Sequence, residues 1–207
     1  GGPFANEGFS YTKKNWGVDG FYRLGRTNRF GAGYDYLDTT RTRFDFDKSK
    51  DKKWFAEWKN SSLDFLSARV KYTELNRRSD FLLGNDGANA LDVLYWNRFL
   101  KAFDVTDLDQ KQLKLTLDAS LGAGVDFSFE GLRKENKYRE QVLGRLKDER
   151  YEYYAALSYG DPSVARFTAF VDRESVKYES RHRVVGSATT AGAYDPSTPD
   201  TAANYNW

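Results

Sequence analysis

Oxygen-bearing side chains recur at every second position of one acidic segment: Asp45, Asp47, Ser49 and Asp51. This spacing begins the loop of a helix–loop–helix calcium site, which continues with glycine at its sixth position and glutamate at its twelfth. Here those positions hold Lys50 and Ala56. The segment therefore favours a solvated loop of mixed charge over a calcium site.

Other groups that could do chemistry are few. His182 is the one histidine, and the arginines on both sides of it disfavour its protonation. The absence of cysteine excludes disulfides, thiolate metal sites and covalent attachment of c-type haem. Carboxylate pairs such as Asp107 and Asp109 are expected by chance among 30 acidic residues. With no nucleophile elbow, phosphate loop or dinucleotide fingerprint, we expect no enzyme activity and no metal or cofactor held by this chain.

The composition points to a sheet with one wet face. The chain is 16% aromatic and 30% charged, with a mean hydropathy of −0.75. Its net charge of +2 gives no bulk attraction to nucleic acid. No apolar run is long enough for a transmembrane helix, and no signal peptide is visible at Gly1.

Apolar and polar residues alternate with a period of two along most of the chain, which predicts strands rather than helices. The expected strands are 8–15, 17–26, 29–43, 52–60, 64–75, 109–120, 123–135, 149–159 and 165–177. One short helix is expected over 89–103 and a second over 138–150. The apolar side of these strands carries Leu66, Val70, Leu115, Leu117, Val125, Phe127, Phe129 and Leu157.

Short and long connections alternate between these strands. Tight turns are expected near Gly25, at 60–64, at 122–124 and at 159–163, where glycine, proline, asparagine and aspartate gather. Longer polar segments separate them, and we expect long loops at 76–107 and 136–150 and a loop-like tail over 179–207. Segregated turn lengths are typical of an up-and-down transmembrane β-barrel, with tight periplasmic turns and long outer loops. We therefore predict an all-β, antiparallel barrel segment of about 9–10 strands, filling residues 1–207 as one unit.

Several strings resemble the MtrB/PioB family of outer-membrane β-barrels, which are associated with decahaem cytochromes. They are Asp51 to Asp64 with Ala68 to Tyr72, Glu152 to Pro162, Val176 to Arg183, Tyr194 to Pro199, and Asn204 to Trp207. The resemblance runs from about Gly20 to the last residue. Because the family barrel has many more strands, the resemblance implies that this chain matches a middle-to-late part of a larger barrel.

The resemblance also implies a function. The family barrel is a sheath in the outer membrane of a Gram-negative bacterium that houses and positions a multihaem c-type cytochrome for transmembrane electron transfer. The implied partners are a periplasmic decahaem cytochrome inside the barrel, an outer-surface multihaem cytochrome, membrane lipid and the remaining strands of the barrel. The haems belong to those partners, in agreement with the lack of cysteine here.

The polar face is where such a partner would be contacted. Charges of both signs recur there, which suits a wet lumen and argues against a funnel for nucleic-acid phosphates. The predicted lumen-facing contact residues are Arg69, Lys71, Lys114, Asp126, Glu130 and Arg166. Two alternatives remain: a porin for diffusion of small solutes, and a soluble β-protein whose aromatic residues form a packed core.

Overall fold

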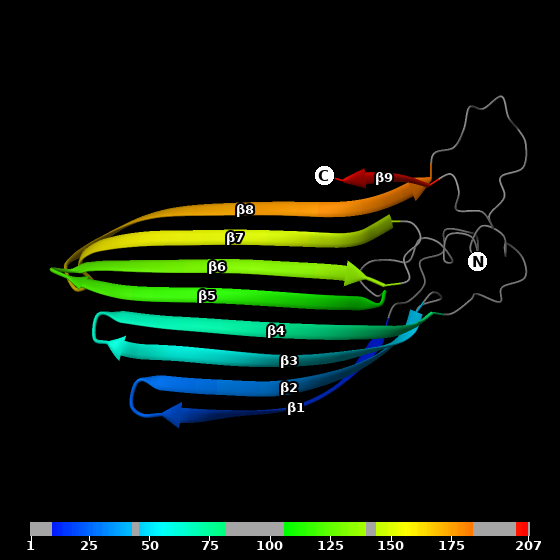
Figure 1. Ribbon diagram of the computed structural model, residues 1–207, viewed down its shortest axis with the longest axis horizontal. Coiled ribbons are helices and arrows are strands. Elements are labelled where there is room, and N and C mark those ends of the chain that lie inside the picture. The colour runs from blue at the N-terminus through cyan, green and yellow to red at the C-terminus, as the bar shows by residue number, and fades with distance from the viewer. Residues whose placement is uncertain (1–9, 43–45, 82–105, 140–143, 184–201, 207) are drawn as a thin grey trace, which may run out of the picture.

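One open sheet accounts for all the regular structure that the computed structural model describes, in residues 10–42, 46–81, 106–139, 144–183 and 202–206. Nine strands follow one another in chain order, each antiparallel to the next (Figure 1). They are β1 (Tyr11–Leu24), β2 (Asn28–Arg41), β3 (Phe46–Leu63), β4 (Leu66–Phe81), β5 (Leu108–Gly122), β6 (Val125–Tyr138), β7 (Gly144–Asp161), β8 (Ala165–Arg183) and β9 (Ala202–Asn206). The prediction of an all-β, up-and-down fold is confirmed. In the described part of the chain, no helix is long and apolar enough to cross a membrane.

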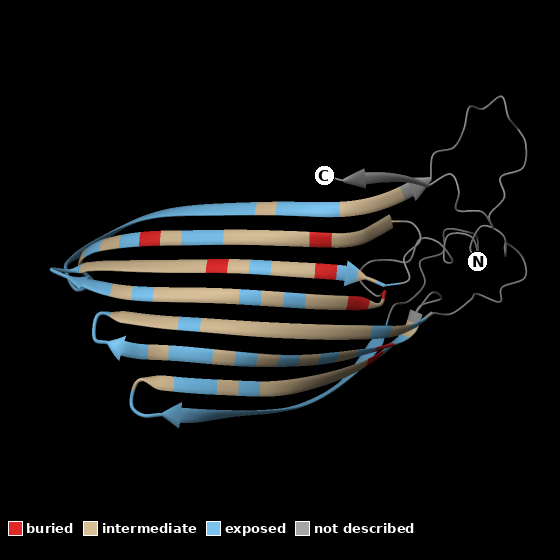
Figure 2. Ribbon diagram, viewed as in Figure 1, coloured by how far each residue is buried: buried red, intermediate tan, exposed pale blue. Residues whose placement is uncertain are grey.

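The sheet is a single layer with almost no core. Among the described residues, only Leu108 and Ala156 are buried apolar side chains, and most strand positions are exposed or half-buried (Figure 2). Large apolar side chains such as Trp16, Phe167 and Val171 are more than half exposed. A soluble β-sandwich would cover one face of this sheet with a second layer. Here the apolar side chains require an apolar medium around them instead.

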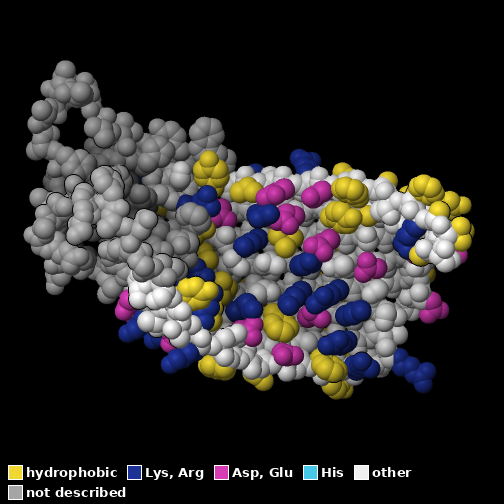
Figure 3. Space-filling model, turned by 180° about the vertical axis from the view of Figure 1, so that it is seen from behind, with side chains coloured by type: hydrophobic (Ala, Val, Ile, Leu, Met, Phe, Trp, Pro, Cys, Tyr) yellow, Lys and Arg dark blue, Asp and Glu magenta, His cyan; other side chains and the backbone are white. Residues whose placement is uncertain are grey.

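The strand register sorts the side chains onto two faces, because directly paired residues and residues two apart share a face. The eight residues predicted for the apolar side, from Leu66 to Leu157, all lie on one face, which we call the apolar face. Lysine, arginine, aspartate and glutamate recur on the opposite, charged face over the same length of strand. Figure 3 shows the charged face, with basic and acidic side chains interspersed across the sheet.

Aromatic side chains on the apolar face gather in two rows. The ring centroids of Trp16 and Tyr36 lie 5.6 Å apart, and those of Trp54 and Tyr72 lie 5.2 Å apart. In a membrane barrel, aromatic rows flank an apolar band about 25 Å tall. Tyr151 and Tyr159 on β7 are far enough apart for this spacing, whereas Trp54 and Trp58 on β3 are closer together. The upper aromatic row, away from the short turns, contains Trp16, Tyr36, Trp54, Tyr72 and Tyr151. The lower aromatic row contains Tyr22, Phe30, Trp58, Phe127, Tyr159 and Phe167.

The upper aromatic row crosses the sheet at a slant. Followed straight along the register, Trp16 on β1 leads to Lys52 on β3 and Asn76 on β4. The aromatic residues of those strands, Trp54 and Tyr72, lie two and four positions closer to the short turns. The row thus shifts by about one residue per strand. In a closed barrel that stagger accompanies a strand tilt of about 36°.

Tight turns join β1 to β2, β3 to β4, β5 to β6 and β7 to β8 at one end of the sheet (Figure 1). The β5–β6 turn has positive φ at both central residues, 50° at Ala123 and 74° at Gly124. This is the backbone of a type I′ turn, whose twist matches that of the flanking strands. The predicted turns near Gly25 and at 122–124 are confirmed, whereas the turn predicted at 159–163 lies at 162–164 and the turn predicted at 60–64 lies at 64–65.

The strands run further than the sequence pattern indicates at the opposite end. β3 begins at Phe46, β4 continues to Phe81 and β8 continues to Arg183, so parts of the expected loops and tail are strand. The first two expected strands are one strand, β1, and a ninth strand lies within the expected tail. The physical reason is that these strand ends are polar on both faces, so no apolar alternation reveals them.

The two predicted helices have different outcomes. The helix over 138–150 is wrong, because β7 begins at Gly144 and its residues pair with β6 and β8 on both sides. Residues such as Glu149 and Lys147 have good helix propensity, and neighbouring strands override it. The helix over 89–103 lies outside the described residues.

Candidate partner-binding face of the sheet

All six predicted contact residues lie on the charged face. Lys71 on β4 is directly opposite Lys114 on β5, and the register carries the same face to Glu130 on β6 and Arg166 on β8. The six residues lie on four strands, β4, β5, β6 and β8, and the structure joins four of the residues in two ion pairs rather than in one cluster.

The two pairs formed within the predicted set bridge neighbouring and non-neighbouring strands. Lys114 Nζ lies 2.6 Å from Glu130 Oε1, which links β5 to β6. Arg166 Nη2 donates to Asp126 Oδ2 at 2.8 Å and reaches from β8 across β7 to do so. Asp126 also accepts a hydrogen bond from the Ser120 hydroxyl at 2.8 Å. Each charge therefore has a partner of opposite sign in the wall itself.

Arg69 and Lys71 contact partners on β3, Glu57 and Phe55, that are not among the predicted contact residues. Arg69 donates to Glu57 Oε2 on β3 at 2.5 Å, and the Lys71 ammonium lies 4.3 Å from the ring centroid of Phe55. Glu57 and Phe55 alternate with Trp54 and the other aromatic residues of β3, so their face could be predicted from the sequence. Their partners could not, because the β3–β4 register is set by pairing between strands.

Two further ion pairs extend this face toward β1 and toward the long connections. Lys53 Nζ on β3 lies 2.7 Å from Asp35 Oδ2 on β2. Arg77 donates two hydrogen bonds to Asp51, at 2.9 and 3.0 Å, from Nε and Nη2. The Asp51 pairing also bears on the predicted loop of mixed charge, because residues 46–51 are part of strand β3 and not of a loop.

These pairs contribute little to folding. The Arg69 side chain is 48% exposed and that of Glu130 is 42% exposed. Ion pairs at this exposure contribute about 0–1 kcal/mol each. Their effect is to keep the face polar, hydrated and nearly neutral, which suits contact with a polar protein surface or with water.

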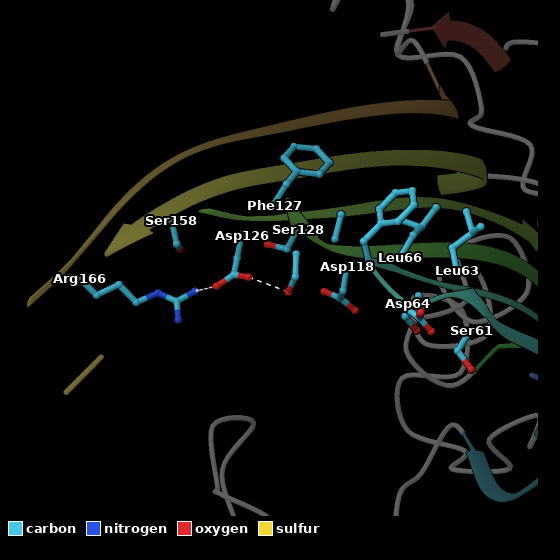
Figure 4. Close-up of a pocket in the computed structure, with 14 residues that line it drawn as sticks. Ser61, Leu63, Asp64, Leu66, Asp118, Asp126, Phe127, Ser128, Ser158 and Arg166 are labelled. Carbon is cyan, nitrogen blue, oxygen red and sulfur yellow. Dashed lines mark hydrogen bonds and ion pairs between the residues drawn. The ribbon is translucent and has the colours of Figure 1, made fainter. Parts of the chain in front are cut away.

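A hollow of about 550 Å³ lies on the sheet near the short turns. Figure 4 shows Arg166 pointing toward Asp126, with Asp118 and Ser128 beside them. Among the described residues, neither Asp118 nor Asp64, which also lines the hollow, forms an ion pair or a hydrogen bond. The hollow is therefore lined by two carboxylates without an internal partner.

A network of polar side chains lies on the charged face at the end away from the short turns, beyond the level of the upper aromatic row. Asn136 donates to Asp148 at 2.8 Å and accepts from Gln110 at 2.9 Å. The Tyr138 hydroxyl donates to the second oxygen of Asp148 at 2.9 Å. Burial, reinforced by the neighbouring Asp148 carboxylate, raises the pKa of Tyr138 to about 12. Since Asn136 and Asp148 are both buried, this network rigidifies the ends of β5, β6 and β7.

No metal centre is formed by the part of the chain that the structure describes. Histidine, aspartate and glutamate there make no group of three that could hold a metal ion. Asp45, the first residue of the calcium-like pattern, lies outside the described residues. His182 lies in β8 opposite Ala203, so it is in a strand rather than in the expected loop.

Comparison with known proteins agrees with this architecture. The family model "Putative outer membrane beta-barrel porin, MtrB/PioB" matches residues 1–205. No curated protein sequence matches the chain. The family match covers nearly the whole chain, and the antiparallel sheet with one apolar face is the wall that such a barrel needs. The chain therefore belongs to the MtrB/PioB family of outer-membrane β-barrel porins.

Proposed function

We propose that this chain is part of a barrel wall that houses and positions a multihaem c-type cytochrome for electron transfer across the outer membrane of a Gram-negative bacterium. The observation that carries the proposal is the charged face, where both signs of charge are paired between strands from β2 to β8. A protein inside the barrel would meet a hydrated, nearly neutral and geometrically fixed surface.

The electrons in this proposal travel through a partner. Covalent c-type haem needs a pair of cysteines before a histidine, and this chain has no cysteine. The partners that we propose are a periplasmic decahaem cytochrome inside the barrel and an outer-surface multihaem cytochrome at the long-connection end. The chain itself acts as insulation and as a positioning surface, without enzymatic activity of its own.

The proposal also requires more strands than this sheet contains. A barrel of about eight strands has an interior just wide enough for side chains or one small ligand, and barrels of 16 or more enclose a channel. The nine strands described here would therefore be one sector of a wider wall. The remaining strands would pair with the free edges of β1 and β9.

Reversing the charge of Arg69, Lys71 and Lys114 to glutamate tests the docking surface. Each substitution removes an exposed contact worth about 0–1 kcal/mol, so the barrel should still assemble. The glutamates would repel Glu57 and Glu130 and present an acidic patch to the lumen. We expect the amount of haem that co-purifies with the barrel to fall, as measured by haem absorbance in a pull-down.

A charge-swapped pair is the matched control. Lys114→Glu combined with Glu130→Lys keeps the ion pair and the net charge and only exchanges its ends. We expect haem recovery near the wild-type level in this variant. Unchanged haem recovery in the triple reversal would remove these three residues from the docking surface.

Diffusion of small solutes is the second candidate function, because a face lined with paired charges is also typical of an aqueous channel. The two functions differ in planar bilayers. A porin conducts ions without any cytochrome, whereas a barrel filled by its partner conducts little until the partner is removed. Electron transfer across proteoliposomes with no cytochrome bound would contradict the sheath.

A further inference from the structure

The apolar face changes character just beyond the upper aromatic row. On each strand from β1 to β8, the residue that follows the aromatic or aliphatic band on this face is charged, and on β6 Gly131 lies between the band and the charged residue. Three of these residues are acidic: Asp38 on β2, Glu74 on β4 and Glu149 on β7. The others form what we call the basic belt: Lys14, Lys52, Lys111, Arg133 and Arg173.

Two of the acidic residues in this line have bound partners within the described part of the chain, whereas most of the basic residues do not. Glu74 accepts a hydrogen bond from Tyr72 at 3.2 Å, and Glu149 is bound by Lys147 at 2.6 Å and by Tyr151 at 3.2 Å. By contrast, every residue of the basic belt is exposed. Within the described residues Lys14, Lys52, Lys111 and Arg173 form no ion pair, and the nearest carboxylate oxygen to Arg133 is 3.8 Å away on Glu135. The register sets Lys14 opposite Asp38 and Lys111 opposite Glu74 and Glu135, but neither ammonium forms an ion pair with any residue that the structure describes. Lys52 and Arg173 have no carboxylate directly opposite them on the paired strands.

A second line of basic residues reinforces the belt one step further from the membrane centre. Lys50 on β3 lies directly opposite Arg78 on β4, next to Lys52 on the same face. Like charges directly opposite each other on paired strands are destabilising. Arg78 is bound by Asp109 at 2.8 Å, so among the described residues Lys50 is the member of this pair that is left without an ion pair.

The other membrane interface lacks this feature. Past the lower aromatic row, the apolar face continues with Leu24 on β1, Asn28 on β2 and Asn60 on β3. Of the nearby short-turn residues, Arg26 is basic and Asp64 and Asp161 are acidic. The excess of positive charge is thus confined to the interface on the long-connection side, which in such barrels faces the outer leaflet.

We propose that the basic belt binds the phosphate groups of anionic lipid headgroups in the outer leaflet. The belt lies at headgroup level, directly beyond aromatic rings that anchor the chain at the interface. Its side chains point away from the lumen, so a cytochrome inside the barrel would not reach them. Phosphate oxygens would supply the negative counter-charge that Lys14, Lys52, Lys111 and Arg173 do not have in an ion pair. This site is independent of whether the lumen holds a cytochrome.

Titration with a phosphorylated lipid tests the proposal on the intact protein in detergent micelles. The probes are diphosphorylated lipid A, the same lipid with its phosphates removed, and inorganic phosphate. We expect only the phosphorylated lipid to raise the melting temperature at low concentration. A basic residue near an anionic lipid surface contributes about fivefold in affinity, so removing three should raise the half-maximal lipid concentration about a hundredfold.

The belt variant is Lys52→Gln with Lys111→Gln and Arg173→Gln. Its matched control removes the same charge elsewhere, through Arg26→Gln, Lys59→Gln and Lys134→Gln at the short turns and on the charged face. Comparing the gel mobility of heated and unheated samples verifies that both variants fold. Wild-type affinity in the belt variant, an equal loss in the control, or equal binding of the dephosphorylated lipid would overturn the proposal. If the belt variant lost a bound protein and kept its lipid affinity, the proposal would also be overturned, and the belt would be assigned to a protein partner.

Discussion

At the scale of single residues, the turn between β7 and β8 depends on one glycine. Gly160 has a φ of +117°, and a Cβ there would lie 2.2 Å from the carbonyl oxygen of Ala165. Because that oxygen belongs to the backbone of β8, it cannot move without breaking the strand pairing. We expect Gly160→Ala to lower the free energy of unfolding by about 2–5 kcal/mol, measured by denaturant titration in lipid vesicles.

The matched control for that substitution is Gly20→Ala on β1. A Cβ at Gly20 meets nothing within 4 Å, and Gly20 is not among the glycines with positive φ. The change places one methyl group on the apolar face, so its effect on stability should be close to zero. Equal losses of stability in both variants would show that the close approach at Gly160 is not the cause.

At the scale of the strand, the assignment of faces makes the sharpest prediction. Val70 and Phe127 lie on the apolar face, Val70 directly opposite Trp58 and Phe127 within the lower aromatic row. Replacing either with arginine should cost up to about 2–4 kcal/mol, the value for a guanidinium near the bilayer midplane, where it is poorly solvated. The measurement is the unfolding free energy of each variant in vesicles.

Substitutions on the opposite face of the same strands provide the comparison. Lys71→Ala removes a contact with the Phe55 ring, and Asp126→Ala removes a hydrogen bond to Arg166. Both side chains are half-buried on the charged face, where water still reaches them, so each loss should be about 1 kcal/mol or less. Tolerated arginines together with damaging alanines would mean that the two faces are exchanged.

The strands themselves were predictable only where they cross hydrocarbon. From Leu66 to Tyr72 one face meets lipid and the other meets water, so the sequence alternates. From Asp47 to Lys53 and from Lys147 to Arg150 both faces are polar, and composition alone resembles a loop or a helix. Pairing with neighbouring strands decides those segments, and no local pattern records it.

The sequence predicts on which face of the sheet the candidate site residues lie, but it does not predict which residues they pair with. Alternation placed Lys114 and Asp126 on the polar side. Asp126, however, is bound by Arg166 from two strands away, a contact that depends on the register of β6, β7 and β8 together. The same holds for the slanted aromatic row, which becomes visible only when the register aligns Trp16 with strands far along the chain.

At the scale of the whole molecule, the open edge of the sheet leads to the last prediction. In the described residues β1 pairs only with β2, so every second N–H of β1 faces outward along the edge. An unsatisfied backbone group in hydrocarbon costs several kcal/mol. We therefore expect another strand to pair with β1 in the membrane. Amide hydrogen exchange of the intact protein in nanodiscs should show protection at all amides from Trp16 to Tyr22, as on the central strand β5. Rapid exchange at alternate amides of β1, with β5 fully protected, would show that the edge stays open to water.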